Sequence, residues 1–185
     1  MYKRQDLRKA QKAAIEVTSD VTVERLERMF EIYWQNCADY GIPPKPRACL
    51  EFLTSKDALG SLTQVYFAML GDAVVAGLLV VFSPITLSYY LPCSSSEYRN
   101  QQPGSLLIDR AVRDARSRGI RFWNWESSPG RDSGVYAFKG KWGSQEDSYR
   151  VYCKTFQPEE KLRALGRDRI AEEFPHYYVW PFDRL

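Results

Sequence analysis

Residues 105–127, SLLIDRAVRDARSRGIRFWNWES, combine the clearest helix of the chain with the strand that follows it. Apolar residues recur there at three- and four-residue steps, which predicts one buried stripe formed by Ile108, Ala111, Val112 and Ala115. Aspartate and arginine residues four apart pair on the solvated side. Gly119 ends the helix, and Ile120–Ser127 follows as a strand with Asn124 and Glu126 on one face and Trp125 on the other.

Three further strands precede this helix. Leu62–Leu70 and Ala73–Phe82 are joined by the turn dipeptide Gly71-Asp72, so they predict an antiparallel hairpin. The second run has no polar alternation, which indicates a central strand covered on both faces. Ile85–Leu91 is the third strand. Because strand, helix and strand follow one another, we expect a right-handed crossover and parallel pairing of the Ile85 and Ile120 strands.

The remaining elements extend this unit on both sides. Ile15–Thr18 is a short strand, an apolar helical stripe runs from Val23 to Cys37, and Pro46 begins a second helix. After the Ile120 strand we expect a short helix over 133–142, a last strand over 148–156 and a helical tail. The order β-α-α-β-β-β-α-β-α-β is typical of an α/β protein with a mixed sheet and helices on both faces.

The composition narrows the class of protein. A chain of 185 residues with 44% hydrophobic and 26% charged residues is an ordinary globular domain. Its longest apolar run, Ala73–Phe82, is well short of the ~20 residues that a membrane span requires. Because the amino end lacks the pattern of a secretory signal, we expect a cytoplasmic protein.

The cysteines, the single histidine and the net charge argue against a catalytic triad, a metal site and nucleic-acid binding. The cysteines form no CxxC pair and are expected to be buried free thiols: Cys37, Cys49, Cys93 and Cys153. A single histidine, His176, argues against a Ser-His-Asp triad, and we expect no metal site. Residues 1–5 resemble a translated sequencing adaptor, which suggests a lost native start. Without Lys3 and Arg4 the formal charge falls from +3 to +1, which gives no support to nucleic-acid binding.

The first candidate binding segment is Pro103-Gly104-Ser105. In α/β sheets, ligands bind beyond the carboxyl ends of parallel strands, where a helix start offers free N–H groups to anions. Gly104 lets the backbone approach a ligand, Ser105 can cap the helix or donate, and Arg99 can meet a phosphate. The alternative is an ordinary Pro-Gly turn that only begins the helix.

The second candidate segment follows the Ile120 strand. Tyr136 and Lys139 lie three apart and share a helix face. Tyr136 can protonate a departing thiolate or alkoxide, and Lys139 can stabilise an oxyanion or a phosphate. The alternative is that Phe138 and Trp142 pack while Lys139 is a solvated charge.

Two further positions have ambiguous roles. Glu126 is a candidate base for an amine acceptor, and its alternative is a salt bridge to Arg121 or Arg131. Tyr89 and Tyr90 are candidates beside a ligand, but tyrosines also suit half-buried strands without any function.

Several motifs together resemble the carboxy-terminal GNAT domain of FemAB-type proteins, including those encoded with exopolysaccharide and exosortase systems. LRKAQKA over 7–13 resembles the basic entry segment of that family, and QPGSLL over 102–107 resembles its helix start. The strongest match is WNWESS over 123–128 followed by GVYAFKGKWG over 134–143, which is similar to the family pattern GxYxFKxxWG. The sequence departs from the family motifs in two places: Gly104 replaces an asparagine, and Asn124-Trp125-Glu126 replaces Asp-Phe-Gly.

The resemblance implies a GNAT-fold N-acyltransferase that moves an acyl or aminoacyl group from acyl-CoA, such as acetyl-CoA, or from aminoacyl-tRNA to a small-molecule or glycan amine of the cell envelope. It implies Tyr136 as the acid and Lys139 as an electrostatic clamp, and Glu126 is the candidate base because of its position at the end of the Ile120 strand. The acceptor side is expected to be formed by Tyr90, Asn124, Trp125, Ser127 and Phe138. The donor side is expected to be formed by Arg99, Pro103, Gly104 and Ser105.

The resemblance also implies a domain organisation. Residues 6–157 form the acyltransferase domain, 158–185 form a helical, aromatic tail, and an upstream GNAT-like domain is expected to be missing because FemAB relatives commonly have two. The rival hypothesis is a non-catalytic GNAT-like module that binds a partner, since the aromatic segment Tyr177–Phe182 suits an interface.

Overall fold

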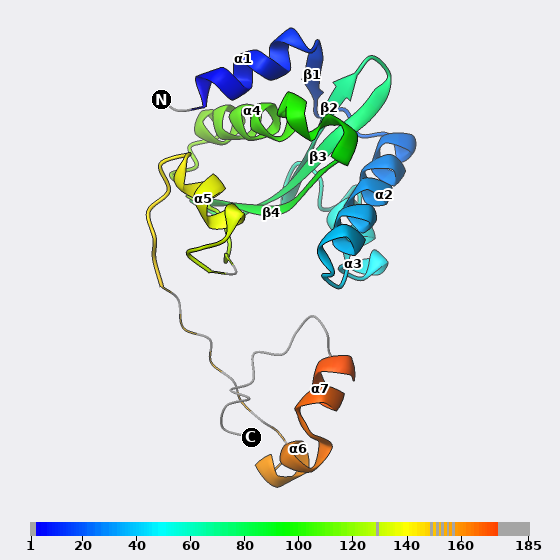
Figure 1. The fold of residues 1–185 in the computed structure, drawn as a ribbon, viewed down its shortest axis with the longest axis vertical. Helices are drawn as coiled ribbons and strands as arrows, with labels where there is room; N and C mark the ends of the chain where they lie inside the picture. Colours follow the sequence, from blue (N-terminus) through cyan, green and yellow to red (C-terminus); the bar gives the residue numbers. More distant parts are fainter. Residues whose placement is uncertain are drawn as a thin grey trace. The chain divides into compact units, whose positions relative to one another are not determined.

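The chain forms two compact units, Met1–Gln145 and Glu146–Leu185. The computed structural model describes residues 3–128, 130–148, 150, 152, 154, 156 and 158–173. The first unit holds a five-stranded sheet with its helices (Figure 1). The described part of the second unit contains the helices α6, Glu159–Leu165, and α7, Arg167–Glu173.

The sheet of the first unit is mixed. Its order follows the chain, with antiparallel pairing from β1 to β4 and parallel pairing of β4 with β5. The strands are β1, Ile15–Thr18; β2, Thr63–Leu70; β3, Ala73–Phe82; β4, Thr86–Ser94; and β5, Phe122–Asn124. The predicted hairpin, the central position of β3 and the parallel crossover are confirmed, and the mixed α/β class with them.

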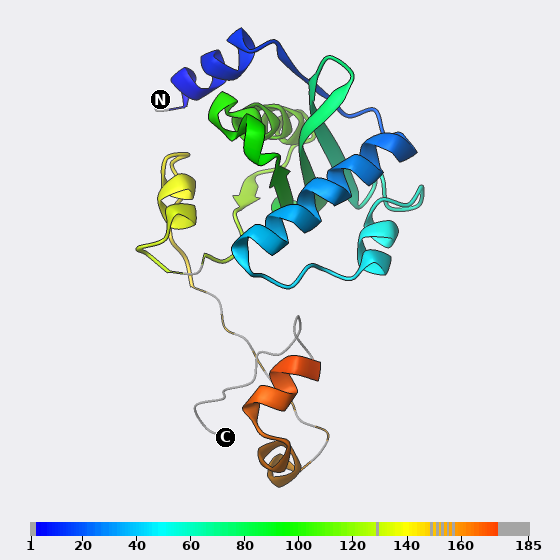
Figure 2. The same cartoon turned by 45° about the vertical axis from the view of Figure 1, so that its right-hand side comes forward.

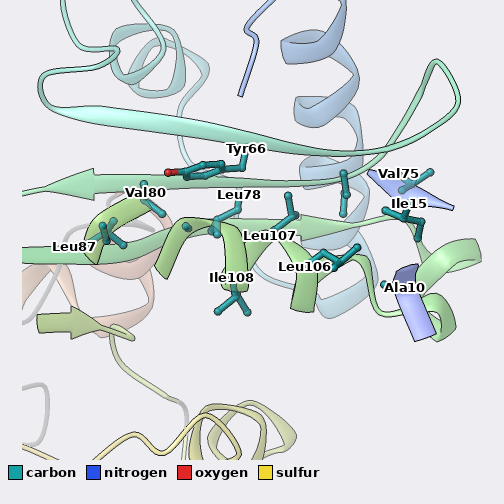
Figure 3. Packing of buried hydrophobic residues seen from close by; sticks show 14 residues of the cluster. Ala10, Ile15, Tyr66, Val75, Leu78, Val80, Leu87, Leu106, Leu107 and Ile108 are labelled. Carbon is teal, nitrogen blue, oxygen red and sulfur yellow. The ribbon is translucent and has the colours of Figure 1, made fainter. Parts of the chain in front are cut away.

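Helices cover both faces of this sheet (Figures 1 and 2). On one face lie α1, Arg4–Lys12, and α4, Pro103–Ser117, whose Leu106, Leu107 and Ile108 pack with β3 and β4 (Figure 3). The other face is covered by α2, Val23–Tyr40, and α3, Arg47–Leu53. Two further helices in this unit are a 3₁₀ turn, η1, at Ser96–Gln101 and α5, Gly134–Gly140.

Three predicted details of the elements are wrong. Val112 is 41% exposed, because the buried face of α4 passes through Ile108, Ala111 and Ala115. The strand expected over Ile120–Ser127 is limited to the three residues of β5. The described residues of the stretch 148–156 form no strand. Tyr152, a residue type that favours strands, is 84% exposed there.

Other expectations concern thiols and membranes. Cys37 and Cys93 are buried and Cys49 is half-buried, and all three are free thiols. Cys153 and His176 lie outside the described residues. No helix in the part of the chain that the structure describes combines the length and apolar character that crossing a membrane requires.

Candidate active site

Strands β4 and β5 pair over only a short length. Their ladder ends at Ser88 and Asn124, whereas β4 continues to Ser94. The Asn124 side chain accepts a hydrogen bond from the backbone N–H of Glu126 at 2.9 Å, and Glu126 has a φ of +58°. This turn, in which an asparagine side chain replaces a backbone carbonyl, ends the strand. The far half of β4 therefore has no parallel neighbour among the described residues.

Lys139 fixes the segment that follows β5. Its ammonium donates to the carbonyl oxygen of Ser127 at 2.6 Å and to that of Glu126 at 3.2 Å, and the residue is only 8% exposed. Burial lowers the pKa of Lys139, and the nearby Glu126 carboxylate opposes that shift. The lysine thus holds two backbone carbonyls in place where the chain leaves the sheet.

A β-bulge in β4 decides which side chains face α4. Leu91 pairs with Leu79, but the next pair joins Tyr89 to Val80, so Tyr90 is the extra residue. A bulge of one residue reverses the alternation of side chains beyond it. Before the bulge Tyr89 packs on the α4 side of the sheet. Beyond it Leu91 packs on the α2 side. Without the bulge Leu91 would share the face of Tyr89, because residues two apart in a strand point to the same face.

A cleft of about 370 Å³ lies beside the unpaired half of β4. One wall is the start of α4, where Gly104 and Ser105 line it, and another is the end of β4, where Ser94 lines it. Arg99 of η1 and Phe138 of α5 complete the lining from two further elements. Residues distant in the sequence therefore meet where the two parallel strands part.

Three buried polar atoms at this cleft have no hydrogen-bond partner among the described residues. Two are the hydroxyl oxygens of Ser94 and Ser105, and the third is the Nη2 nitrogen of Arg99, which makes an ion pair with the Asp39 carboxylate at 3.6 Å. Ser105 is only 2% exposed. Buried polar groups in folded proteins are nearly always hydrogen-bonded, so a cluster of exceptions in one cleft indicates a place where a ligand supplies the partners.

The start of α4 adds to this polar end. Gln102 precedes the helix with a φ of +62°, and no side chain caps the first turn. The first N–H groups of a helix carry a partial positive charge. Apart from its chain neighbours and the backbone of its own helix, no heavy atom lies within 4 Å of the position that a Cβ would occupy at Gly104, so a ligand can approach the backbone there.

Asn36 of α2 connects that helix to the end of β4. Its side-chain amide donates to the carbonyl of Ser94 at 3.0 Å and accepts from the N–H of Ser94 at 2.9 Å. Nearby, Arg99 lies 3.6 Å from the Asp39 carboxylate and 5.3 Å from the Tyr40 ring centroid. These contacts hold the polar end of the cleft between α2 and α4.

The opposite end of the cleft is apolar and uncharged. Tyr89 and Phe138 belong to this end, and Leu78 and Leu107 also line the cleft. Burial raises the pKa of Tyr89, and burial raises that of the Cys93 thiol, which also lines the cleft, to about 12. Both groups are protonated at neutral pH, so Cys93 is not an activated nucleophile.

Five aromatic rings form a cluster around this apolar end. The ring centroid of Trp125 lies 5.1 Å from that of Tyr89, 6.3 Å from that of Phe138, 5.3 Å from that of Trp123 and 6.1 Å from that of Trp142. Strands β4 and β5 and helix α5 thus meet through ring contacts. Trp125 stands behind the two rings that line the cleft.

The structure brings together part of the predicted site. Five of the predicted residues line the cleft: Arg99, Pro103, Gly104, Ser105 and Phe138. Seven are not among its lining residues: Tyr90, Asn124, Trp125, Glu126, Ser127, Tyr136 and Lys139. Of these, Tyr90 packs toward α2 and α3, where its hydroxyl is 4.0 Å from the sulfur of Cys49, and the carboxylate of the exposed Glu126 accepts from Asn124 at 3.0 Å.

Lys3, which the adaptor hypothesis sets aside, contacts the same region. Its ammonium is 2.7 Å from the Asp6 carboxylate, 4.5 Å from the ring centroid of Phe138 and 5.5 Å from that of Trp142. Attraction between a cation and an aromatic face stabilises such a contact. The origin of residues 1–5 stays a hypothesis.

Sequence reasoning missed Asn36, Ser94 and Gln102 as residues of the cleft. One signal was present, since Asn36 is a polar residue within the apolar helical stripe that ends at Cys37. Ser94 gave no signal, because it follows the predicted end of its strand. In the described part of the chain, no three histidine, cysteine, aspartate or glutamate side chains are grouped as metal ligands would be.

In this mixed sheet two parallel strands part beside an uncapped helix start, which is where α/β proteins commonly bind their ligands. A family model described as Acetyltransferase (GNAT) domain matches residues 2–131, which is most of the chain. The chain belongs to the GNAT acetyltransferase domain family and is an acyltransferase enzyme.

Solved structures share this fold. FemX superposes with a TM-score of 0.61 at 16% identity, over 76% of this chain and 53% of FemX. A transcriptional regulator from Bacillus halodurans C-125 gives 0.59 at 18% identity, over 76% and 99% of the two chains. A predicted acetyltransferase with acetyl-CoA from Clostridium acetobutylicum gives 0.58 at 17% identity, over 76% and 96%. No curated protein matches the sequence.

Proposed function

We propose that this chain transfers an acyl group from acyl-CoA to an amine, with the donor's phosphates at the start of α4 and its acyl end at Tyr89 and Phe138. The observation that carries the proposal is the pair of buried hydroxyls without hydrogen-bond partners among the described residues, Ser94 and Ser105, beside the Arg99 guanidinium in one cleft. Phosphate oxygens accept hydrogen bonds from hydroxyls and guanidinium groups, and they are attracted to helix starts.

The two ends of the cleft differ in polarity in the same way as the two ends of an acyl-CoA. A CoA thioester is anionic at one end and apolar at its acyl end, and it brings an activated carbonyl. The cleft has cationic and hydroxyl donors at the α4 end and uncharged rings at the other. In the reaction the amine nitrogen bonds to the carbonyl carbon, the carbon–sulfur bond breaks, and the proton lost by the amine balances the one gained by the thiolate.

The site contributes mainly by positioning. Holding two reactants in a near-attack geometry can supply a large part of an acyl transfer rate. Tyr136 as the acid and Glu126 as the base remain assignments from the sequence, and they are tested by Tyr136→Phe and Glu126→Gln in the turnover assay below. The acceptor suggested by the resemblance of residues 123–128 and 134–143 to FemAB-type motifs is a cell-envelope or glycan amine.

The first experiment measures donor binding without an acceptor. Calorimetric titration of the full chain with acetyl-CoA and with S-acetylpantetheine, which lacks the pyrophosphate, isolates the contribution of the α4 end. Ser105→Ala removes one hydrogen bond to a charged group, so we expect roughly tenfold weaker binding of acetyl-CoA and unchanged binding of S-acetylpantetheine.

Ser117→Ala is the matched control, because Ser117 lies at the other end of α4 and its hydroxyl donates to the carbonyl of Asp114. This variant should bind acetyl-CoA as the wild type does. If the wild type binds neither acetyl-CoA nor CoA, or if Ser105→Ala has no effect, the donor site is not at α4.

The second experiment measures turnover. Mass spectrometry of an amine panel, with acetyl-CoA or aminoacyl-tRNA as donor, tests both donors that the sequence suggested. We expect acylated amine with acetyl-CoA that is insensitive to ribonuclease. Product formed only from aminoacyl-tRNA, and lost after ribonuclease treatment, would contradict acyl-CoA as the donor and identify aminoacyl-tRNA instead.

A further inference from the structure

We infer that Tyr89 and Phe138 determine how long an acyl chain this protein accepts, and that they restrict it to short-chain acyl thioesters. The inference rests on the proposed function, since it requires a CoA thioester in the cleft. It adds a specificity for the acyl group, which neither the fold nor the family match provides.

The polarity of the cleft gives the direction of the bound thioester. The unpartnered hydroxyls of Ser94 and Ser105 and the guanidinium of Arg99 belong to the end of β4, the start of α4 and η1. The other end is lined by Tyr89 and Phe138 with aliphatic side chains beside them. An apolar acyl group is therefore directed toward the two rings.

The bulge in β4 makes the cleft continuous between these ends. Tyr89 and Ser94 are an odd number of residues apart, so in a regular strand their side chains would point to opposite faces. The extra residue, Tyr90, brings both to the α4 side, where both line the cleft. Their partners on β3, Val80 and Ala76, are four residues apart, which is about 13 Å along the strand, so Tyr89 lies well away from Ser94.

The two rings form a rigid wall. Tyr89 contacts Trp123 at 6.1 Å and Trp125 at 5.1 Å between ring centroids, and Phe138 is in edge contact with Trp125. The ammonium of Lys3 covers the ring of Phe138 at 4.5 Å. A ring held from several sides cannot turn away to admit a longer chain without breaking these contacts. The wall therefore acts as a stop.

A longer acyl chain meets this stop in the wild type but gains apolar contact when the stop is removed. Each methylene buried in an apolar site contributes roughly a fourfold gain in affinity. In the wild type we expect no such gain from acetyl to hexanoyl. In Phe138→Ala the space left by the ring admits the chain, so affinity rises with chain length.

The experiment is a calorimetric titration with acetyl-, butyryl- and hexanoyl-CoA. The measured quantity is the ratio of the acetyl-CoA to the hexanoyl-CoA dissociation constant. We expect Phe138→Ala to raise this ratio at least about tenfold over the wild type. Phe52→Ala is the matched control, because Phe52 lies on α3 and is 63% exposed. That variant should leave the ratio unchanged.

The outcomes separate this inference from the function on which it rests. If the wild type binds acetyl-CoA but the ratio is the same in all variants, the acyl-length assignment is wrong while the donor site stands. If the wild type binds no CoA ester, the proposed function fails and the inference fails with it. Should Phe138→Ala lose its thermal transition, Phe138→Leu keeps an apolar side chain and must shift the ratio in the same direction.

Discussion

Replacing Gly77 by alanine should destabilise the sheet through a single side chain on α2. Gly77 lies opposite Cys93 in the ladder between β3 and β4. A Cβ at Gly77 would lie 2.5 Å from both Cγ and Sδ of Met29 and 3.0 Å from its Cε. Met29 is fully buried, so its whole side chain would have to move within a packed core.

Two opposing terms set the size of the effect. Overpacking a core costs about 1–3 kcal/mol. Replacing a glycine inside a strand by alanine, where space allows, gains about 0.5–1 kcal/mol. The free energy of unfolding should therefore fall by about 1–2 kcal/mol. In a Met29→Ala background the obstruction is gone, so the same Gly77→Ala change should be neutral or stabilising.

Urea unfolding of the four proteins, followed by circular dichroism, measures this coupling directly. A double-mutant cycle isolates the interaction of the two positions, which we expect to be about 1.5–3 kcal/mol. The reasoning is refuted if Gly77→Ala stabilises the wild type. It is equally refuted if the change costs the same with and without the Met29 side chain.

Two further predictions follow from buried polar groups. Lys139→Met removes two charge-assisted hydrogen bonds to backbone carbonyls, so the free energy of unfolding measured by urea titration should fall by about 2–3 kcal/mol. A loss below about 0.5 kcal/mol would contradict the anchoring role of Lys139. Burial raises the pKa of both Tyr33 and Cys93 to about 12, so the unfolded chain releases these protons first. These groups should leave stability unaffected below about pH 8. Stability should then fall by about 1.4 kcal/mol per group and pH unit above each unfolded-state pKa, which is about 8.5 for cysteine and about 10 for tyrosine. Urea midpoints from about pH 7 to 11 would show this loss, and midpoints independent of pH would exclude it.

Most of the fold could be predicted because its elements are bounded by strong local signals. The run Ala73–Phe82 forms β3 with the same limits, since Gly71-Asp72 and Pro84 punctuate both ends. The stripe on α2 is equally clear. The strand after α4 was predicted too long, because a composition rich in aromatic residues does not reveal the Asn124 turn that ends β5.

The candidate site could be predicted only where it depends on the backbone of one segment. The start of α4, Pro103-Gly104-Ser105, is identifiable because a glycine beside a helix start has a local meaning. The bulge at Tyr90 has no sequence signal, yet it decides which tyrosine faces the cleft. Helical spacing places Lys139 on a face with Tyr136 but gives no indication that its ammonium binds backbone carbonyls.

The aromatic wall also has a spectroscopic consequence. Three of the five tryptophans in the chain, Trp123, Trp125 and Trp142, belong to the ring cluster that backs the cleft. Indole emission depends strongly on the polarity and packing around the ring. The protein therefore carries an intrinsic fluorescent probe at the end of its own cleft, and filling that end with an acyl group should change the emission without any added label.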